Sequence, residues 1–275
     1  MRAFPFEAGP VTRRSTITST SNGRLKAVRR LARRPPADVV LAEGRSAVHA
    51  VLEAGLPVRE LYASPGLFLG GVDDERLVAR AELAGARIVE LGSAAFRSAS
   101  ANVRPDGLLA LVERPPSSLA RLRLRRDPLL VVADAIDRPG NLGTIARTAC
   151  AAGAHALVAA NGGTDVFHRE VVRGSVGAIF RLPVAAAAGE RAIAWLREHD
   201  LRIVVASPDG ERPYWAADYR GAVAVVVGNE RRGVGESWLR AADETVAIPM
   251  SPPADSVNVA VAAGVVLFEA ARQRS

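Results

Sequence analysis

The sequence predicts an α/β protein of two domains, the second of which is built on a parallel sheet covered by helices. Three observations predict this class. The chain has 275 residues, which is longer than a single hydrophobic core usually organises. Apolar segments of strand length alternate with helical segments along most of the chain. In the second half these apolar segments are continuous runs of Val, Ala and Leu, as expected for strands buried on both faces of a parallel sheet.

The first predicted domain spans residues 35–113. Helices are predicted at Arg45–Ala54, which ends before Gly55, and at Asp74–Ala84, because both carry apolar residues three or four apart. Residues 114–127 combine prolines, serines and arginines without a stable period, which predicts a linker. The strands of this domain are predicted at 39–42, 58–63, 87–91 and 108–112.

The second predicted domain spans residues 128–275. Two of its helices, at 141–154 and 255–272, are rich in small residues. In the last helix Asp255 or Ser256 is the expected N-cap, and a stripe of Val257, Val261, Val265 and Phe268 is expected to face the core. The strands are predicted at 129–133, 156–160, 182–186, 202–206, 222–227 and 245–248.

Composition excludes several classes of protein. Hydrophobic residues make up 49% and charged residues 24% of the chain, which excludes wholesale disorder. The longest apolar stretches are too short or too interrupted to span a bilayer, and no secretory signal is visible, so we expect a cytoplasmic protein. Cys150 is the single cysteine, so an internal disulfide is impossible. The four histidines (His49, His155, His168 and His199) are scattered, which argues against a zinc site.

Positive charge is concentrated at the start of the chain. Residues 1–34 hold nine Lys or Arg residues against the single acid Glu7, whereas the remaining residues sum to a net charge of −1. A basic N-terminal arm followed by a nearly neutral body is typical of a protein that binds a polyanion, and nucleic acid is the expected partner. An ordinary solvated terminus would have the same composition, so charge alone does not decide between them.

Three segments of the second domain combine glycine, asparagine and charge at the ends of predicted strands, where open α/β sheets bind ligands. The first runs from Asp137 to Arg147. If a helix begins near Asn141, Gly143 and Arg147 share a face, and the missing side chain of Gly143 would leave room for a phosphate or ribose below the guanidinium. A capped helix with a surface arginine would explain this segment equally well.

The second segment is Gly228–Gly235, after the strand at 222–227, and the third is Ile248–Val259, before the last helix. The second segment lacks the spacing of a phosphate-binding P-loop and of the dinucleotide fingerprint, which argues against nucleotide hydrolysis. A tight turn with solvated charges is the alternative interpretation. In the third segment, Asn258 lies off the apolar stripe and is free to face a ligand or another loop.

In order along the chain, these segments resemble the motifs of the SPOUT superfamily of RNA methyltransferases, in its SpoU/TrmH-like branch of ribose 2'-O-methyltransferases. The resemblance covers residues 129–274 most strongly. It rests on Asn141-x-Gly143-x-x-x-Arg147, on Gly228-Asn229-Glu230 with Gly233, and on Ile248-Pro249-Met250 followed by Ser256-Val257-Asn258-Val259. Residues 42–44 and 107–110 are similar, less specifically, to the family's ribosomal-protein-like RNA-binding domain.

The resemblance implies a deep trefoil knot in the second domain, S-adenosylmethionine bound in its loops, no metal, and a homodimer formed through the C-terminal domain. It implies cofactor-binding positions at Gly228, Asn229, Ile248, Met250 and Val257, where the family more often carries leucine at the last of these. The catalytic positions it implies are Arg147, Asn141, Glu230, Ser256 and Asn258. The expected substrate is RNA, most of all large-subunit ribosomal RNA with a possible link to antibiotic resistance, and the expected reaction is methylation of a ribose 2'-oxygen.

The residue types are consistent with this chemistry. A sulfonium methyl is already electrophilic, so the protein mainly has to align a ribose oxygen with it. Because an arginine is a poor general base, Arg147 is expected to anchor a phosphate or a developing alkoxide. Three alternatives stay open: a tRNA ribose methyltransferase, a non-catalytic RNA-binding protein of the same fold, and a nucleotide-dependent Rossmann-like enzyme.

Overall fold

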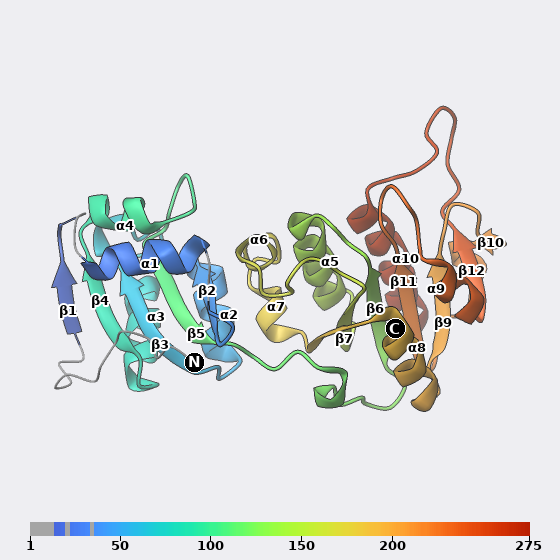
Figure 1. Cartoon of the computed structure of the whole chain (residues 1–275), viewed down its shortest axis with the longest axis horizontal. Coiled ribbons are helices and arrows are strands. Elements are labelled where there is room, and N and C mark those ends of the chain that lie inside the picture. Colours follow the sequence, from blue (N-terminus) through green and yellow to red (C-terminus); the bar gives the residue numbers. More distant parts are fainter. Residues whose placement is uncertain (1–13, 20–22, 34–35) are drawn as a thin grey trace. The chain divides into compact units, whose positions relative to one another are not determined.

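The computed structural model describes residues 14–19, 23–33 and 36–275. The chain forms two compact units, Met1–Glu113 and Arg114–Ser275, and each has its own sheet (Figure 1). None of the described helices is long and apolar enough to cross a membrane.

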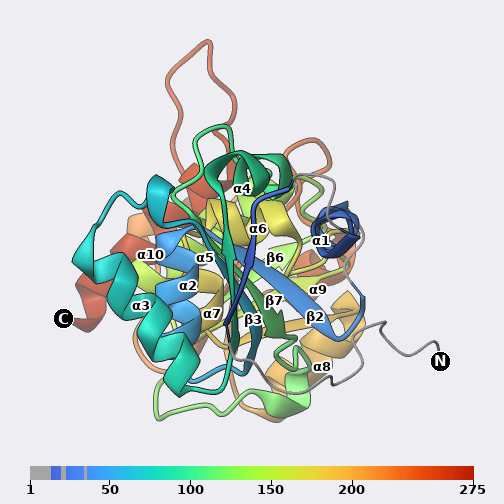
Figure 2. The same ribbon diagram turned by 90° about the vertical axis from the view of Figure 1, so that its left-hand side faces the viewer.

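The first unit is a five-stranded mixed sheet in the order β1-β4-β3-β5-β2, in which β5 runs antiparallel to both of its neighbours. Helices α1 and α4 pack on one face of this sheet, and α2 and α3 lie on the other (Figure 2). The strands are β1 Arg14–Ile17, β2 Val39–Glu43, β3 Val58–Ala63, β4 Arg87–Leu91 and β5 Leu108–Glu113. The helices are α1 Gly23–Arg33, α2 Arg45–Glu53, α3 Val72–Leu83 and α4 Ser93–Ala99, with a 3-10 turn at Pro65–Leu67.

Part of the predicted basic arm is folded into this unit. Strand β1 pairs in parallel with β4, and Leu25 and Val28 of α1 are fully buried in the core. Residues 1–13, 20–22 and 34–35 of the arm lie outside the described residues. The charge count did not indicate these elements, because apolar residues three apart, such as Leu25 and Val28, suffice to anchor a short helix that is otherwise rich in arginine.

The second unit is a seven-stranded, entirely parallel sheet in the order β10-β12-β9-β11-β6-β7-β8. This confirms the prediction of a parallel sheet with both faces covered, since β6, β7 and β11 are buried along their whole lengths. The strands are β6 Leu129–Asp134, β7 Ala156–Ala160, β8 Val184–Ala187, β9 Arg202–Ala206, β10 Arg212–Pro213, β11 Val223–Val227 and β12 Glu244–Ala247.

Two groups of helices cover this sheet. Helices α5, α6, α7 and α10 pack together, and α8 and α9 form the second group. In the second group, Trp195 of α8 and Trp238 of α9 pack on the inward side chains of β6, β7, β9 and β11. The helices are α5 Pro139–Ala151, α6 Arg169–Gly174, α7 Ala178–Arg181, α8 Gly189–Glu198, α9 Glu236–Ala241 and α10 Val259–Arg274, with 3-10 turns at Leu119–Arg121 and Tyr214–Ala216.

The segment 114–127, expected to be a linker, is part of the second unit and packs on its core. Leu119 and Leu122 are buried in its core, and the Ala186 amide donates to the Ser117 carbonyl at 2.9 Å. Its prolines, serines and arginines predicted a linker, but two buried leucines three residues apart attach it to the core of the unit.

The last helix differs from its prediction in start and in orientation. Helix α10 begins at Val259, and Asn258 is its N-cap, because the Asn258 side-chain oxygen accepts from the Ala260 amide at 2.9 Å. The expected core stripe was wrong: Val257, Val261 and Phe268 are 40%, 53% and 53% exposed. The buried side is instead formed by Val259, Ala260, Ala263, Val266, Leu267 and Ala270. Because α10 is apolar on several sides, periodicity alone could not select the buried face.

Candidate functional site

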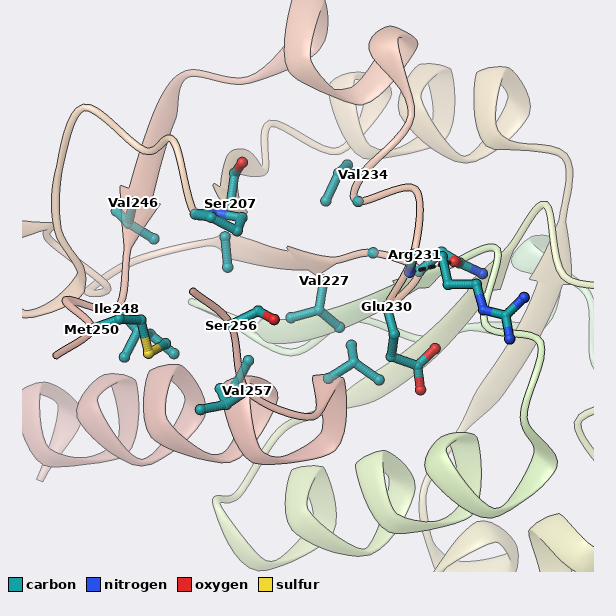
Figure 3. Close-up of a pocket in the computed structure, with 17 residues that line it drawn as sticks. Ser207, Val227, Glu230, Arg231, Val234, Val246, Ile248, Met250, Ser256 and Val257 are labelled. Atoms are coloured by element: carbon teal, nitrogen blue, oxygen red, sulfur yellow. Dashed lines mark hydrogen bonds between the residues drawn. The ribbon is translucent and has the colours of Figure 1, made fainter. Parts of the chain in front are cut away.

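The three glycine- and asparagine-containing segments meet at one edge of the parallel sheet, where the strands have their carboxyl ends; we call it the carboxyl edge. A pocket of about 230 Å³ lies there. It is lined by residues at and after the carboxyl ends of β9, β11 and β12 and by the start of α10 (Figure 3). The segment between β12 and α10, residues 248–258, projects away from the sheet above this edge (Figure 1).

All five predicted cofactor-binding residues line the pocket: Gly228, Asn229, Ile248, Met250 and Val257. Two of the predicted catalytic residues, Glu230 and Ser256, also line it. Glu230 and Arg231 are the charged residues among the described pocket lining, and most of the remainder is apolar. Such a lining suits a ligand with a large apolar surface that is held by a few backbone and polar contacts.

One wall of the pocket is a tight turn after β11, residues 228–235, which we call the glycine turn. Asn229 and Gly233 exchange two backbone hydrogen bonds, of 3.0 and 2.9 Å. This brings Gly228 so close to the opposite strand of the turn that a Cβ atom there would lie 2.5 Å from the backbone of Gly233. Only glycine fits at position 228, and the exposed backbone of the turn is available to a ligand.

Asn229 stabilises this turn through its side chain. Its Nδ2 donates to the Ala135 carbonyl at 2.9 Å and to the Asp137 carboxylate at 2.8 Å, while its Oδ1 accepts from the amides of Arg231 and Arg232. The residue is only 5% exposed. Its amide is therefore used within the protein, and its backbone is the part left to face the pocket.

Three predicted catalytic residues, one from each segment, form a hydrogen-bonded chain. Asn141 Nδ2 donates to Glu230 Oε1, and Asn258 Nδ2 donates to Asn141 Oδ1 at 3.2 Å. Asn258 is itself held by its role as the N-cap of α10. These hydrogen bonds tie the Glu230 carboxylate to the other two segments. Glu230 itself lies beside the pocket (Figure 3).

Arg147 takes no part in this series of hydrogen bonds. It is exposed on α5, six residues beyond Asn141, which is about 9 Å along a helix at 1.5 Å per residue. Its side chain does not line the pocket, and it makes no hydrogen bond or ion pair with any other residue that the structure describes. Its guanidinium is thus available to a ligand outside the pocket.

The space expected below Arg147 does not exist. Gly143 is buried, and a Cβ atom on it would lie 2.7 Å from the Val171 carbonyl oxygen and 3.0 Å from the Gly174 Cα atom. The missing side chain allows α5 and α6 to touch through their backbones, so the ligand space predicted from helical spacing is occupied by α6.

Sequence reasoning also missed residues at the site. Ala206, the last residue of β9, and the following Ser207 and Pro208 line the pocket. Their position at the carboxyl end of a predicted parallel strand could have identified them, because the carboxyl ends of parallel strands lie at the same edge of a sheet. Asp134, the last residue of β6, supports the glycine turn by accepting a hydrogen bond of 2.9 Å from the Gly235 amide.

Among the described residues no group of His, Cys, Asp or Glu is arranged to hold a metal ion.

Comparison with known proteins relates the second unit to one family. Residues 128–268 match the SpoU rRNA Methylase family. A 23S rRNA (uridine(2479)-2'-O)-methyltransferase of Streptomyces viridochromogenes is 37% identical over 179 residues, which are 63% of this chain and 62% of that relative. The chain therefore spans less than two thirds of that relative's length.

Two solved structures match nearly the whole chain. The crystal structure of an RNA 2'-O ribose methyltransferase has a TM-score of 0.83 at 36% identity, covering 94% of this chain and 99% of that one. The AdoMet-bound rRNA methyltransferase from Sinorhizobium meliloti has a TM-score of 0.84 at 30% identity, with 94% and 98% covered.

Proposed function

The chain belongs to the SpoU rRNA methylase family, and from this premise we propose that it transfers a methyl group from S-adenosylmethionine to the 2'-oxygen of a ribose in large-subunit ribosomal RNA. The observation that carries the proposal is the convergence of the three segments on one pocket, with all five predicted cofactor positions in its lining. The enzyme class and the methyl donor are those of the family, and related methyltransferases have been solved with AdoMet bound.

The pocket fits the methyl donor. Its largely apolar walls suit an adenine ring, and the backbone of the glycine turn approaches the cavity at Gly228, where a side chain would not fit. Gly228, Ile248, Met250 and Val257 would hold the cofactor, with Asn229 keeping the turn in shape. The bound cofactor supplies an electrophilic methyl group, so the protein's task is alignment and exclusion of water.

The remaining predicted catalytic residues would act on the RNA. Asn141, Glu230 and Asn258 form a fixed polar chain beside the pocket, which suits orientation of a ribose hydroxyl. Ser256 is exposed on the segment 248–258 and lines the same pocket. The free guanidinium of Arg147 would anchor the RNA backbone or a developing alkoxide through its planar set of donors.

We further propose a homodimer formed through the second unit. The exposed side of α10 carries Val261 and Phe268, and Val257, just before the helix, extends this apolar surface to the pocket. A second copy of the chain would cover this surface and bring a second α5 close to the site. The family resemblance also leads us to expect that the segment 248–258 contributes to a deep trefoil knot.

The choice of RNA rests on the relatives. The Streptomyces viridochromogenes relative acts on a uridine of 23S rRNA, which favours large-subunit ribosomal RNA, whereas several other relatives are uncharacterized tRNA/rRNA methyltransferases. Transfer RNA is therefore the alternative substrate. A role in antibiotic resistance would follow if the methylated ribose lies at a drug-binding site of the ribosome.

The experiment that tests the proposal uses total RNA from a strain that lacks the gene. The purified protein and tritiated S-adenosylmethionine should label the large-subunit RNA at one nucleotide, and the adjacent phosphodiester should resist alkaline cleavage. RNA from the parent strain is the control and should take up no label, because its site is already methylated. Label on a base would refute 2'-O-methylation, and label in tRNA would establish the alternative substrate.

A further inference from the structure

We propose that Asp134 and Asn161 are a positioning pair that holds the glycine turn and thereby sets the affinity of the pocket for the methyl donor. This inference rests on the proposed function of the pocket. Neither residue lines the pocket or belongs to the three segments identified from the sequence. Their effect on the reaction would be exerted through the backbone of residues 228–235.

The Asp134 carboxylate is buried at the carboxyl end of β6, with 2% of the residue exposed. One oxygen, Oδ2, accepts from the Gly235 amide at 2.9 Å, and the other, Oδ1, accepts from Asn161 Nδ2 at 2.9 Å. Asp134 forms no ion pair with any residue in the described part of the chain. A buried carboxylate without a cationic partner is costly, so two well-formed hydrogen bonds must compensate for its lost hydration.

Asn161 has one orientation available for its amide. Asn161 follows β7 and has a left-handed backbone conformation, with φ at 50°. Its Oδ1 accepts a hydrogen bond of 2.7 Å from the Gly189 amide at the start of α8. Inverting the amide would turn its NH₂ group toward the Gly189 amide, leaving two donors face to face. Asn161 Nδ2 is therefore fixed toward Asp134, and the pair links the ends of β6 and β7 to the glycine turn.

The last residue of β6 and the residues that follow it hold the glycine turn at both ends. Asp134 holds Gly235 at the far end, while the Ala135 carbonyl and the Asp137 carboxylate hold Asn229 at the near end. Between these two anchors, Glu230, Arg231, Gly233 and Val234 line the pocket. A displacement of Gly235 would be transmitted to Gly233 and Gly228, which are in contact across the turn.

This arrangement makes a sharp test possible, because exchanging the two side chains preserves every hydrogen bond. In Asp134→Asn, the new amide has one oxygen for two donors, so one bond is lost and two NH groups face each other. In Asn161→Asp, two carboxylates face each other. In the double exchange, the amide now at position 134 would accept from the Gly235 amide and donate to the carboxylate now at position 161. That carboxylate would also accept from the Gly189 amide, so all three bonds would be restored.

The measurement is the Kd for S-adenosylmethionine by titration calorimetry on the full chain. We expect each single variant to bind roughly 10-fold more weakly, the scale of one buried hydrogen bond lost, and the double exchange to return to within about 3-fold of the wild type. If Asp134→Asn does not fold, Asn161→Ala serves in its place, because it removes one partner of Asp134 and leaves the Gly235 contact intact.

The matched control is Asp243→Asn. The Asp243 carboxylate also accepts a backbone amide, that of Ile203 at 2.7 Å, but at the opposite edge of the sheet. This variant should lower the Tm and leave the Kd unchanged. The proposal is overturned if Asp134→Asn lowers only the Tm, as the control does, or if the double exchange binds as weakly as the single variants. Failure of the wild type to bind would instead refute the proposed function of the pocket.

Discussion

The two edges of the seven-stranded sheet use polar side chains in opposite ways. At the amino edge, where the strands begin, the guanidinium of Arg274 donates to the carbonyls of Asp127, Tyr219 and Gly221, and Arg197 pairs with Asp243 at 2.7 Å. At the carboxyl edge, Asp134, Asn141, Asn161, Asn229 and Asn258 bond to one another and to backbone around an open pocket.

The difference shows how one sheet separates stability from function. Arginines at the amino edge reach several backbone carbonyls that take no part in strand pairing and would otherwise lack partners. Amides at the carboxyl edge act as donor and acceptor at once, so they hold loops in place without adding net charge to the site. We therefore expect substitutions at the carboxyl edge to change binding or turnover, and substitutions at the amino edge to change stability alone.

The largest effect is expected for Arg147, whose exposed side chain lies on α5 outside the pocket. Arg147→Ala should lower methyl transfer by about three orders of magnitude, because an anion anchor is lost, while the Kd for S-adenosylmethionine stays within a few-fold. Arg147→Lys should fail as well, since an ammonium cannot make a bidentate contact. Single-turnover kinetics would measure both.

The control for Arg147 is Arg240→Ala. Arg240 is exposed on α9, where it pairs with Glu236 at 3.1 Å. Unchanged turnover in Arg147→Ala would remove this residue from the mechanism, and wild-type turnover in Arg147→Lys would show that charge alone is sufficient.

The next effect concerns the pocket wall. Gly228→Ala should weaken S-adenosylmethionine binding at least about 100-fold, because its Cβ atom would have to displace the backbone of Gly233 from the turn. Gly140→Ala is the control at the same edge, since a Cβ atom there meets nothing within 4 Å. Calorimetry on both variants tests this, and equal Kd values would contradict the close approach at Gly228.

A smaller effect is expected at the amino edge. Arg274→Ala should lower the free energy of unfolding by about 3 kcal/mol, because three carbonyls lose a charged donor. Urea unfolding would measure the loss, and the Kd for S-adenosylmethionine should not change. A weakened Kd at unchanged stability would erase the contrast between the two edges.

The smallest effect is a pH dependence at the same edge. Burial, together with Arg125 and Arg274, lowers the pKa of His155 below its ordinary value of 6.5. The unfolded chain then takes up the proton first, so stability is lost as the pH falls below that value. Urea midpoints at about pH 7.5 and about pH 5.5 should differ more in the wild type than in His155→Gln. An equal difference would show that His155 does not contribute.

Much of the second unit was predictable because its signals are local. The continuous apolar runs predicted the strands of the parallel sheet, and glycine and asparagine after them predicted where a pocket would form. The three segments were expected to converge, and Asn141, Glu230 and Asn258, one from each, are joined by hydrogen bonds. The expectation for Gly143 failed, because helical spacing shows which residues share a face but not which neighbouring helix occupies it.

The sequence by itself determined the parallel α/β order, the three segments at the strand ends and the family to which they belong. Only the tertiary structure decided which side of α10 is buried and which carboxylate holds the glycine turn. The reason is separation along the chain: Asp134 is 27 residues from Asn161 and 101 from Gly235. Such contacts depend on the register of whole strands and helices, which no local pattern of residues records.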